Sequence, residues 1–330
     1  MSQMEILYLS RSDVAAVGLS MEEVISLVER ALIEHGQKRI QMPPSSGVSP
    51  GGGAFIHAMP AYLPRLKVMG MKWVSIAPHH LATGLDRITG LLILNDPETT
   101  LPICALDCAW ITAMRTAAVS GVAAKFLAHP EASTAAIIGA GVQGRTNLLA
   151  LQEVLPNLKQ VRVYDINPAA LKGYCQEMKP LVGVSIEPAG SIREAVKAAH
   201  VVVTATPVQP KPRPLVEDEW FGPGGLAIPL EIDSAWPRST FEGVDKFICD
   251  DRRQLQHASR GDFPVHFFSS GLPAIYAELG EVVCGQKPGR ENNDERIVSL
   301  NMGMGIHDVT VGGHIYRIAL EKGIGTRLPL

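Results

Sequence analysis

The chain has 330 residues, of which 46% are apolar and 5% aromatic, and its formal net charge is −3. This length allows two domains with a sizeable core. The small negative charge gives no electrostatic basis for binding nucleic acid or an anionic membrane. No apolar run approaches the ~20 residues that cross a bilayer, and no signal peptide is visible, so we expect a cytoplasmic protein.

The N-terminal third predicts an α+β domain. The predicted elements, in chain order, are a helix at 20–36, a Pro/Ser/Gly loop at 42–53, strands at 54–59, 68–76, 90–95 and 101–107, and an Ala-rich helix at 109–128. Ser20 and Glu23 have the spacing of a capping box, which favours a helix start at this point. The last two strands flank a turn and predict a hairpin.

From about residue 135 to 295, strand and helix patterns alternate, which is typical of a doubly wound parallel sheet. Predicted strands are 135–138, 161–164, 183–187, 200–204, 225–230 and 246–250, and predicted helices are 142–154, 168–178, 191–199 and 271–280. The segment 298–320 predicts a glycine-broken helix outside this sheet that returns to the first domain. We therefore expect a substrate-binding and dimerisation domain at 1–120 with 300–330, and a Rossmann domain at 121–299.

A dinucleotide fingerprint begins the second domain. Gly139 allows a tight turn after a strand, Gly141 lets the backbone approach a pyrophosphate, and Gly144 lets the following helix pack on that strand. Asp165, which ends the next strand, can bind the adenosine ribose hydroxyls and would repel a 2′-phosphate. These features predict NAD(H). The alternatives are FAD, or a glycine-rich turn without a ligand.

The five cysteines are scattered and show neither a CxxC pair nor Cys/His ligand spacing. We interpret them as reduced thiols, and we predict no bound metal.

Six stretches spread over nearly the whole chain form a specific set: MPAY at 59–62, MKWV at 71–74, TAMRTAA at 112–118, the fingerprint at 139–144, AELGEV at 277–282 and MGIHD at 304–308. Together they resemble the ornithine cyclodeaminase/mu-crystallin family, which includes archaeal alanine dehydrogenase and cyclic-imine reductases. The resemblance implies an NAD(P)-binding Rossmann domain and a dimerising N-terminal substrate domain. It also implies chemistry at the α-carbon of a small amino acid or its imine.

The resemblance also implies roles for single residues. Lys72 matches the lysine that binds the substrate carboxylate, Arg115 matches an arginine that contacts both carboxylate and cofactor, and Asp233 matches a general acid/base. Cofactor contacts fall on Arg115, Thr116, Gly139, Gly141, Val142, Gln143, Gly144, Asp165, Thr204 and Asn301. Candidate substrate contacts are Lys72, Arg115, His57 and Met302, with Lys72 and Asp233 as the catalytic pair.

Each of these assignments has a structural alternative. Arg115 lies among small apolar residues, where a charge needs a partner, and that partner could form a purely structural ion pair. Lys72 could point to solvent from its strand. Asp233 could cap a loop, and Glu231, two residues earlier, could compete for its role.

The substrate half of the chain departs from the ornithine cyclodeaminases. Ser45 stands where they have a further arginine, and His57 stands where they have an acidic residue. The lysine that follows the catalytic acid is missing, and Asn301 replaces a serine near the nicotinamide. Ornithine is therefore in doubt, and His57, His79 and His80 are candidates either for a different pocket or for structural hydrogen bonds.

The retained acid favours an ornithine cyclodeaminase-like reaction, in which hydride abstraction, imine formation, ammonia loss and hydride return follow one another. The alternatives are an amino-acid dehydrogenase or a cyclic-imine reductase acting on a small amino-acid or imino-acid substrate. A non-catalytic NAD(P)H-binding protein is the alternative of another class. We further expect a homodimer.

Overall fold

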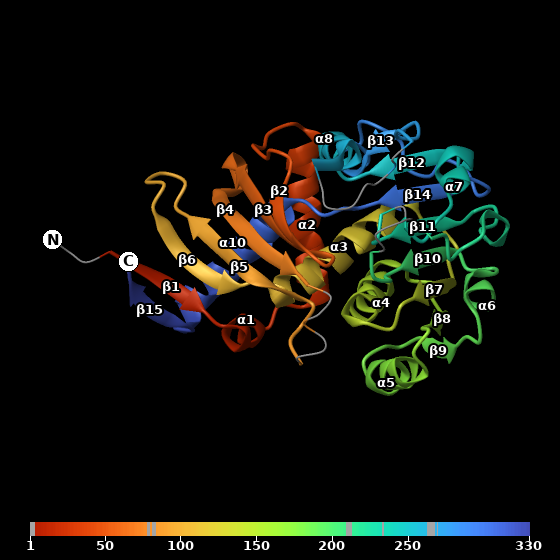
Figure 1. The fold of residues 1–330 in the computed structure, drawn as a ribbon, viewed down its shortest axis with the longest axis horizontal. Coiled ribbons are helices and arrows are strands. Elements are labelled where there is room, and N and C mark those ends of the chain that lie inside the picture. Colours follow the sequence, from red (N-terminus) through yellow and green to blue (C-terminus); the bar gives the residue numbers. More distant parts are fainter. Residues whose placement is uncertain are drawn as a thin grey trace. The chain divides into compact units, whose positions relative to one another are not determined.

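The computed structural model describes residues 4–77, 80, 84–208, 213–232, 234–262, 268 and 270–330. The chain divides into two compact units, and the division at Arg115 falls within helix α3 (Ala109–Leu127) (Figure 1). The first unit comprises mainly Met1–Arg115 and Gly303–Leu330, and the second mainly Thr116–Gly261 and Val265–Met302. Both predicted fold classes are confirmed: a largely antiparallel sheet with helices, and a parallel Rossmann-type sheet.

The first unit is built on a sheet with strand order β15-β1-β6-β5-β4-β3-β2. Strands β2 to β6 pair as antiparallel neighbours, whereas β1 pairs parallel with β6. The predicted hairpin of β5 and β6 is confirmed. The strands are β1 (Glu5–Leu9), β2 (Ser46–Gly51), β3 (Ala54–Leu63), β4 (Val68–Ile76), β5 (Ile88–Asn95), β6 (Pro102–Asp107) and β15 (Thr326–Pro329), and the helices are α1 (Arg11–Val17), α2 (Met21–Gly36), the short η1 (Pro64–Leu66) and α10 (Gly305–Lys322).

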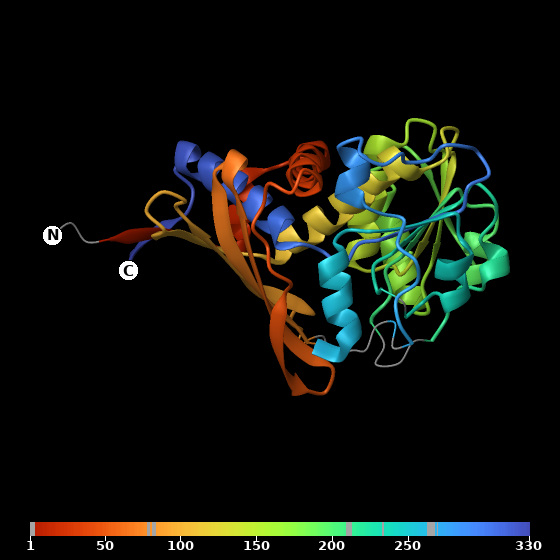
Figure 2. The same ribbon diagram turned by 90° about the horizontal axis from the view of Figure 1, so that it is seen from above.

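Helices α10 and α2 lie along one face of this sheet (Figure 2). Glycines let α10 lie close to the strands. A Cβ atom on Gly312 would come within 2.2 Å of the Leu92 side chain, and one on Gly305 within 2.6 Å of the Met59 carbonyl oxygen. The predicted capping box at the start of α2 is confirmed, with Ser20 and Glu23 each accepting a backbone amide of the other.

The second unit holds a sheet with strand order β13-β12-β14-β11-β10-β7-β8-β9, in which every recorded pairing is parallel. The order β9-β8-β7-β10-β11 follows the 3-2-1-4-5 arrangement of dinucleotide-binding folds, and β14, the last strand of this sheet in sequence, takes the next place. The strands are β7 (Thr134–Ile138), β8 (Gln160–Tyr164), β9 (Ser185–Pro188), β10 (Val201–Thr204), β11 (Leu226–Pro229), β12 (Lys246–Cys249), β13 (Ala277–Glu278) and β14 (Ile297–Leu300). The helical segments are α4 (Val142–Val154), α5 (Pro168–Met178), α6 (Ile192–Val196), η3 (Asp218–Trp220), α7 (Arg238–Gly243), α8 (Arg252–His257), the π-helical turn η4 (Ala258–Asp262) and α9 (Leu279–Val283).

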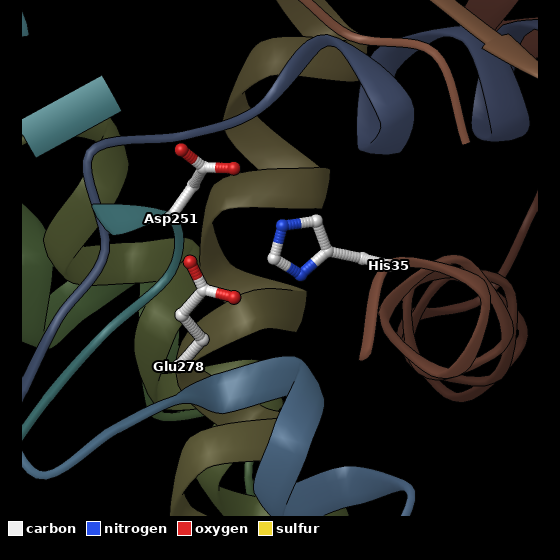
Figure 3. A group of neighbouring side chains, drawn as sticks. All are labelled: His35, Asp251 and Glu278. Atoms are coloured by element: carbon white, nitrogen blue, oxygen red, sulfur yellow. The ribbon is translucent and has the colours of Figure 1, made fainter. Parts of the chain in front are cut away.

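Two acidic residues cap short helices at the β12–β13 end of this sheet. Asp251 accepts the amide of Gln254 at 2.7 Å and so caps α8, and Glu278 accepts the amide of Arg252 at 2.9 Å. Figure 3 shows both side chains: Asp251 lies in the loop after β12, and Glu278 ends β13 directly before α9. Because backbone donors bind these carboxylates, both have a structural role at helix starts.

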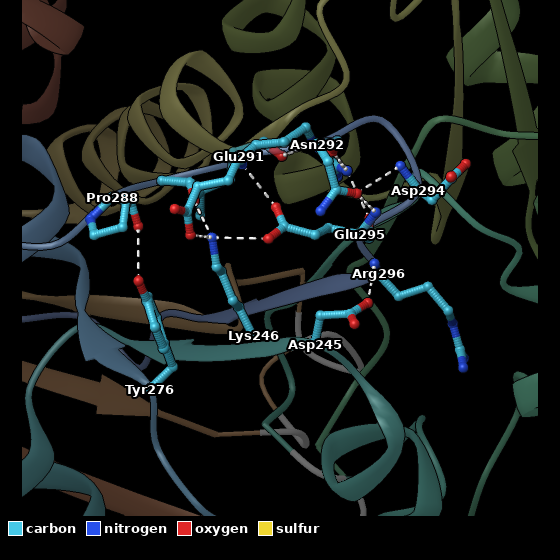
Figure 4. Close-up of polar contacts among 12 residues, drawn as sticks. Asp245, Lys246, Tyr276, Pro288, Glu291, Asn292, Asp294, Glu295 and Arg296 are labelled. Carbon is cyan, nitrogen blue, oxygen red and sulfur yellow. Dashed lines mark hydrogen bonds and ion pairs between the residues drawn. The ribbon is translucent and has the colours of Figure 1, made fainter.

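A polar cluster fixes the loop before β14. The Lys246 ammonium group pairs with Glu291 at 2.7 Å and with Glu295 at 2.9 Å, and it lies over the Tyr276 ring (Figure 4). Asp245 accepts the amide of Arg296 at 2.8 Å. This cluster connects the loop to β12 and so fixes the chain as it enters β14.

Two predicted elements of the C-terminal part are wrong. Residues 271–280 do not form a helix, because Gly271 and Pro273 interrupt it and the chain instead pairs as β13. The segment 298–320 was predicted to lie wholly outside the Rossmann sheet, but β14 inserts between β12 and β11. Its glycines do not break α10; they allow it to pack closely.

Smaller differences concern short or exposed elements. Strand β2 forms within the predicted loop at 42–53, and β1 and β15 were not predicted. Every residue of β2 and of β15 is exposed, so neither strand shows the apolar alternation that marks a half-buried strand. Helix α6 is shorter than predicted and ends before Ala198, whose φ is 63°.

We predict that Gly305→Ala destabilises the first unit, because the added methyl group would press on the Met59 carbonyl oxygen and push α10 away from β3. Overpacking of this kind costs about 1–3 kcal/mol. Denaturant unfolding followed by circular dichroism measures the change. Gly243→Ala is the control, since a Cβ there meets nothing within 4 Å. An unchanged midpoint for Gly305→Ala would contradict the proposed close packing.

Candidate functional site

Three charged side chains meet in the interior of the first unit. Lys72 extends from β4 and Arg115 from α3, and both bind the same carboxylate oxygen of Asp308 in the first turn of α10. The Lys72 Nζ–Oδ1 distance is 2.8 Å, and the Arg115 Nε–Oδ1 distance is 3.0 Å. Lys72 is 1% exposed and Asp308 is fully buried. The structure therefore brings the two predicted carboxylate-binding cations together and excludes a solvent-pointing Lys72.

These three groups carry one more positive charge than negative charge. Burial and the neighbouring Arg115 lower the pKa of Lys72 to about 8, while Asp308 opposes this change. Lys72 therefore keeps its proton at neutral pH. A buried excess charge is costly unless an anion compensates it. The second oxygen of Asp308 has no hydrogen-bond partner among the described residues. The cluster is suited to receive a bound carboxylate.

The guanidinium group of Arg115 lies against Gly303. Gly303 has a φ of 96°, and a Cβ atom there would come within 2.4 Å of Arg115 Nη1. Glycine is therefore required at this position for two reasons, since other residues rarely adopt this backbone conformation and a side chain would displace Arg115. Asp308, the partner of Arg115, was not recognised from the sequence. The available signal was an acidic residue in the first turn of an otherwise apolar buried helix.

His57 lies on the same face of the sheet as Lys72, because Met59 is the direct partner of Lys72 and side chains alternate along β3. Burial and the charge of Lys72 lower the pKa of His57 to about 4, so its ring is neutral at physiological pH. Ser45 is also buried, while His80 binds the Asp86 carbonyl oxygen at 3.1 Å. The predicted substrate positions His57 and Ser45 thus carry no charge.

In the second unit, the fingerprint turn has the geometry that a dinucleotide needs. A Cβ atom on Gly139 would come within 2.6 Å of the Ala205 carbonyl oxygen, and one on Gly144 within 2.1 Å of the Gly139 carbonyl oxygen. A Cβ atom on Gly141 would meet nothing within 4 Å, so this backbone faces open space at the start of α4. Free amide groups and the positive end of the helix dipole there suit a pyrophosphate.

Asp165 follows β8 and is tied to this turn. Its carboxylate accepts the amide of Ala140 at 2.7 Å and that of Asn167 at 2.8 Å. Arg145 donates to the Ala140 carbonyl oxygen and pairs with Glu177 at 2.8 Å. Backbone donors therefore hold Asp165, which the sequence predicts to bind the ribose, beside the glycine turn.

The remaining cofactor positions gather along the same sheet edge. Thr204 ends β10, Asn301 follows β14, and both side chains are buried. Asn301 Nδ2 donates to Ser299 Oγ at 3.3 Å. Because the strands are parallel, their carboxyl ends all lie at the edge where doubly wound folds bind ligands.

The other predicted residues are neighbours in the chain of those already described. Val142 is exposed and Gln143 half-buried in the first turn of α4, and Thr116 and Met302 are half-buried. Asp233 and His79 lie outside the described residues. All five cysteines are free, and no helix of the described part is long and apolar enough to cross a membrane.

The chain is similar to known proteins over nearly its whole length. Residues 4–323 match the model of the ornithine cyclodeaminase/mu-crystallin family. The nodulation efficiency protein NfeD of Rhizobium meliloti is 34% identical, with 97% of each chain covered. The structure of Thermococcus litoralis Δ1-pyrroline-2-carboxylate reductase with NADH and L-proline is 34% identical, with a TM-score of 0.86 and coverage of 97% of this chain and 99% of that one. An archaeal alanine dehydrogenase dimer with bound NAD is 30% identical, with a TM-score of 0.87 and coverage of 99% and 100%.

These matches extend over both units, and the glycine fingerprint, Lys72, Arg115 and the segment around Asp308 all fall within the matched range. The chain therefore belongs to the ornithine cyclodeaminase/mu-crystallin family.

Proposed function

We propose that this protein is an NAD(H)-dependent enzyme that transfers hydride at the α-carbon of a small amino acid or imino acid. The carrying observation is the buried group of Lys72, Arg115 and Asp308, in which two cations share one carboxylate and no second anion pairs with them among the described residues. A substrate carboxylate would supply the missing negative charge.

NAD is the cofactor. Gly139, Gly141 and Gly144 have the geometry for its pyrophosphate, and Asp165 stands where a ribose diol needs a hydrogen-bond acceptor. A 2′-phosphate at that position would face the Asp165 carboxylate. When bound, NAD accepts or supplies the hydride.

Lys72 and Arg115 would hold the substrate carboxylate by complementary means. The guanidinium group of Arg115 offers donors in a fixed plane, whereas Lys72 acts as a compact point charge. One carboxylate oxygen of Asp308 accepts hydrogen bonds from both cations and so orients them before substrate arrives. Because both side chains are already oriented, they need to move little when a carboxylate binds.

The groups described around Lys72 and Arg115 argue against a substrate with a second ammonium group. The charge of Asp308 is already shared by two cations, and the low pKa of His57 makes it a neutral neighbour. Ser45 is likewise uncharged. Among these groups, an ornithine ammonium group would find only the second oxygen of Asp308, whose charge those two cations already offset. A small neutral side chain or a cyclic imino acid suits them better.

Proton transfer at the substrate nitrogen requires a general acid or base. We assign this role to Asp233 on its place in the sequence, directly after the turn that follows β11. Ile232, just before it, has a φ of 64°, a rare conformation for a β-branched residue. Strained backbone of this kind often occurs at functional sites.

Two net reactions are compatible with these residues and with NAD. Net oxidation or reduction is favoured, because an imino-acid reductase and an alanine dehydrogenase are among the similar solved structures, at 34% and 30% identity, whereas a lysine cyclodeaminase is 25% identical. Cyclodeaminase chemistry, in which the hydride returns and ammonia leaves, is the second candidate. It is favoured by Asp233, which matches the general acid/base of the cyclodeaminases, and it is the reaction that the sequence analysis favours.

A homodimer would bury the uncovered face of the first sheet. Trp73 on β4 is 42% exposed and Leu91 on β5 is 41% exposed, and the two are direct cross-strand partners. Met71 and Ile93 form the next pair on the same face. A contiguous apolar patch of this kind marks an interaction surface, and the similar archaeal alanine dehydrogenase is a dimer. We therefore assign dimerisation to the first unit.

We predict that Gly141→Ala weakens NADH binding about tenfold, because the methyl group enters the open space needed by the pyrophosphate. Its thermal stability is expected to match wild type, since a Cβ there has no neighbour within 4 Å. NADH fluorescence titration and a thermal melt measure the two effects. Gly222→Ala, equally open in the same unit, is the control and should bind normally. Normal binding by Gly141→Ala would argue against a cofactor at this turn.

The function is tested by supplying NADH with Δ1-pyrroline-2-carboxylate, and NAD with alanine, proline, lysine or ornithine, while NADH absorbance and ammonia are followed. Stoichiometric change in NADH would support net oxidation or reduction. Ammonia release without net NADH would identify a cyclodeaminase. Neither signal with any substrate would overturn the proposal.

Within this assay, Lys72→Met should lower kcat/KM about 100-fold, since the mutation removes a buried charge from the carboxylate site. NADH affinity should be unchanged. The exposed Lys67→Met is the matched control. Because the pKa of Lys72 is about 8, its charge is lost as pH rises through that value, and substrate KM should increase there. Full activity in Lys72→Met would exclude the assigned role.

Trp73→Glu is expected to convert a dimer into monomers, because it places a charge in the centre of the proposed apolar interface. Light scattering after size exclusion measures the mass. Leu181→Glu, which alters a 62% exposed leucine of the second unit, should remain dimeric. A monomeric wild type, or a dimeric Trp73→Glu, would contradict the assignment.

A further inference from the structure

The Asp308 carboxylate uses its two oxygen atoms unequally. Its Oδ1 atom accepts hydrogen bonds from Lys72 Nζ at 2.8 Å and from Arg115 Nε at 3.0 Å. Its Oδ2 atom is buried and has no hydrogen-bond partner among the described residues. Such atoms are rare in folded proteins, because an unpaired buried acceptor has lost its hydrogen bonds to water without replacement. Oδ2 is therefore an acceptor that a ligand can use.

Oδ2 lies beside the two cations that the proposed function assigns to a substrate carboxylate. Both oxygens of Asp308 are bonded to the same carbon, so Oδ2 stands directly next to the atom on which Lys72 and Arg115 converge. Asp308 and Lys72 are both buried, and Lys72 is no more accessible than Oδ2. A carboxylate that pairs with the Lys72 ammonium group therefore comes next to Oδ2 as well.

The two cations have donors left for a ligand. An ammonium group carries three N–H donors and a guanidinium group five. Within the described part of the chain, the one recorded hydrogen bond of the Lys72 side chain and that of the Arg115 side chain both go to Oδ1 of Asp308. The cluster thus presents several donors and one acceptor side by side. An α-amino acid has the complementary set, since its carboxylate accepts and the nitrogen on the adjacent carbon donates.

The charges and donors of the cluster decide which ligand atom suits Oδ2. A carboxylate, carbonyl or ether oxygen would place one acceptor against another, which is repulsive. An N–H group satisfies Oδ2, while the neighbouring carboxylate offsets the excess positive charge of Lys72 and Arg115. A substrate nitrogen at Oδ2 also leaves no oxygen of Asp308 for a side-chain ammonium group.

We propose that Asp308 is a substrate-binding residue whose Oδ2 atom accepts a hydrogen bond from the N–H group on the substrate α-carbon. It thereby selects α-amino acids and protonated imino acids over carboxylates that have no donor at that position. Asp308 holds the nitrogen by this hydrogen bond, and proton transfer stays with Asp233. The inference rests on the proposed carboxylate site and is independent of which net reaction follows.

The test compares two planar carboxylates of nearly the same shape, pyrrole-2-carboxylate and furan-2-carboxylate. Beside the carbon that bears the carboxylate, the first has an N–H donor and the second a ring oxygen. Calorimetric titration of the full-length protein with NADH present gives both dissociation constants. Wild type should bind pyrrole-2-carboxylate about ten- to 100-fold more tightly, because only this ligand can donate to Oδ2. Equal affinities would overturn the inference and leave the carboxylate site in place, whereas binding of neither ligand would overturn both.

Asp308→Asn tests the same contact from the side of the protein. The cations attract the amide oxygen, so the amide nitrogen takes the place of Oδ2 and presents a donor there. The preference for pyrrole-2-carboxylate should disappear or reverse, and any general change in carboxylate affinity cancels because it affects both ligands. Asp233→Asn, the same change at the proposed proton-transfer residue, should keep the wild-type preference. An unchanged preference in Asp308→Asn, or its loss in Asp233→Asn, would contradict the proposal.

A third ligand covers the case in which Asp308→Asn fails to fold. N-Methylpyrrole-2-carboxylate keeps the ring nitrogen but has no N–H group, so wild type should bind it no better than furan-2-carboxylate. Binding as tight as that of pyrrole-2-carboxylate would show that the N–H group is not recognised and would refute the proposal.

Discussion

The shared carboxylate of Asp308 is the interaction on which the substrate half of this protein depends. Two cations from β4 and α3 converge on one oxygen contributed by α10. That convergence is possible only if α10 lies very close to the sheet, and Gly305 and Gly312 make the close approach possible. Removing Asp308 would leave two buried cations without this shared carboxylate. The close packing of α10 on the sheet and the placement of these charges therefore depend on each other.

The cofactor half depends on backbone geometry more than on charge. Gly139 and Gly144 are fixed by neighbouring carbonyl oxygens, and Asp165 is held by two amides. Of the three fingerprint glycines, only Gly141 faces open space. A turn defined by main-chain contacts depends on where its glycines lie more than on its side chains.

The sequence predicted the features that have local signals. The capping box of Ser20, the β5–β6 hairpin, and the strands and glycines of the dinucleotide fold depend on neighbours in the chain, and the structure confirms them. Strand β14 was missed because its partners β11 and β12 are set by topology. Asp308 was missed for the same reason: its partner Lys72 lies 236 residues away. Contacts between residues so far apart in the sequence produce no periodic pattern in it.

Two buried acids illustrate how environment assigns chemistry. Asp308 binds the Lys72 and Arg115 side chains, whereas Glu231 has only weak polar neighbours, and burial raises its pKa to about 7. Neighbouring charges and burial together set the behaviour of a buried carboxyl group. The first of these acids can thus orient the cations for a substrate carboxylate. The residue type alone predicts neither behaviour, since both depend on what the fold places around the carboxyl group.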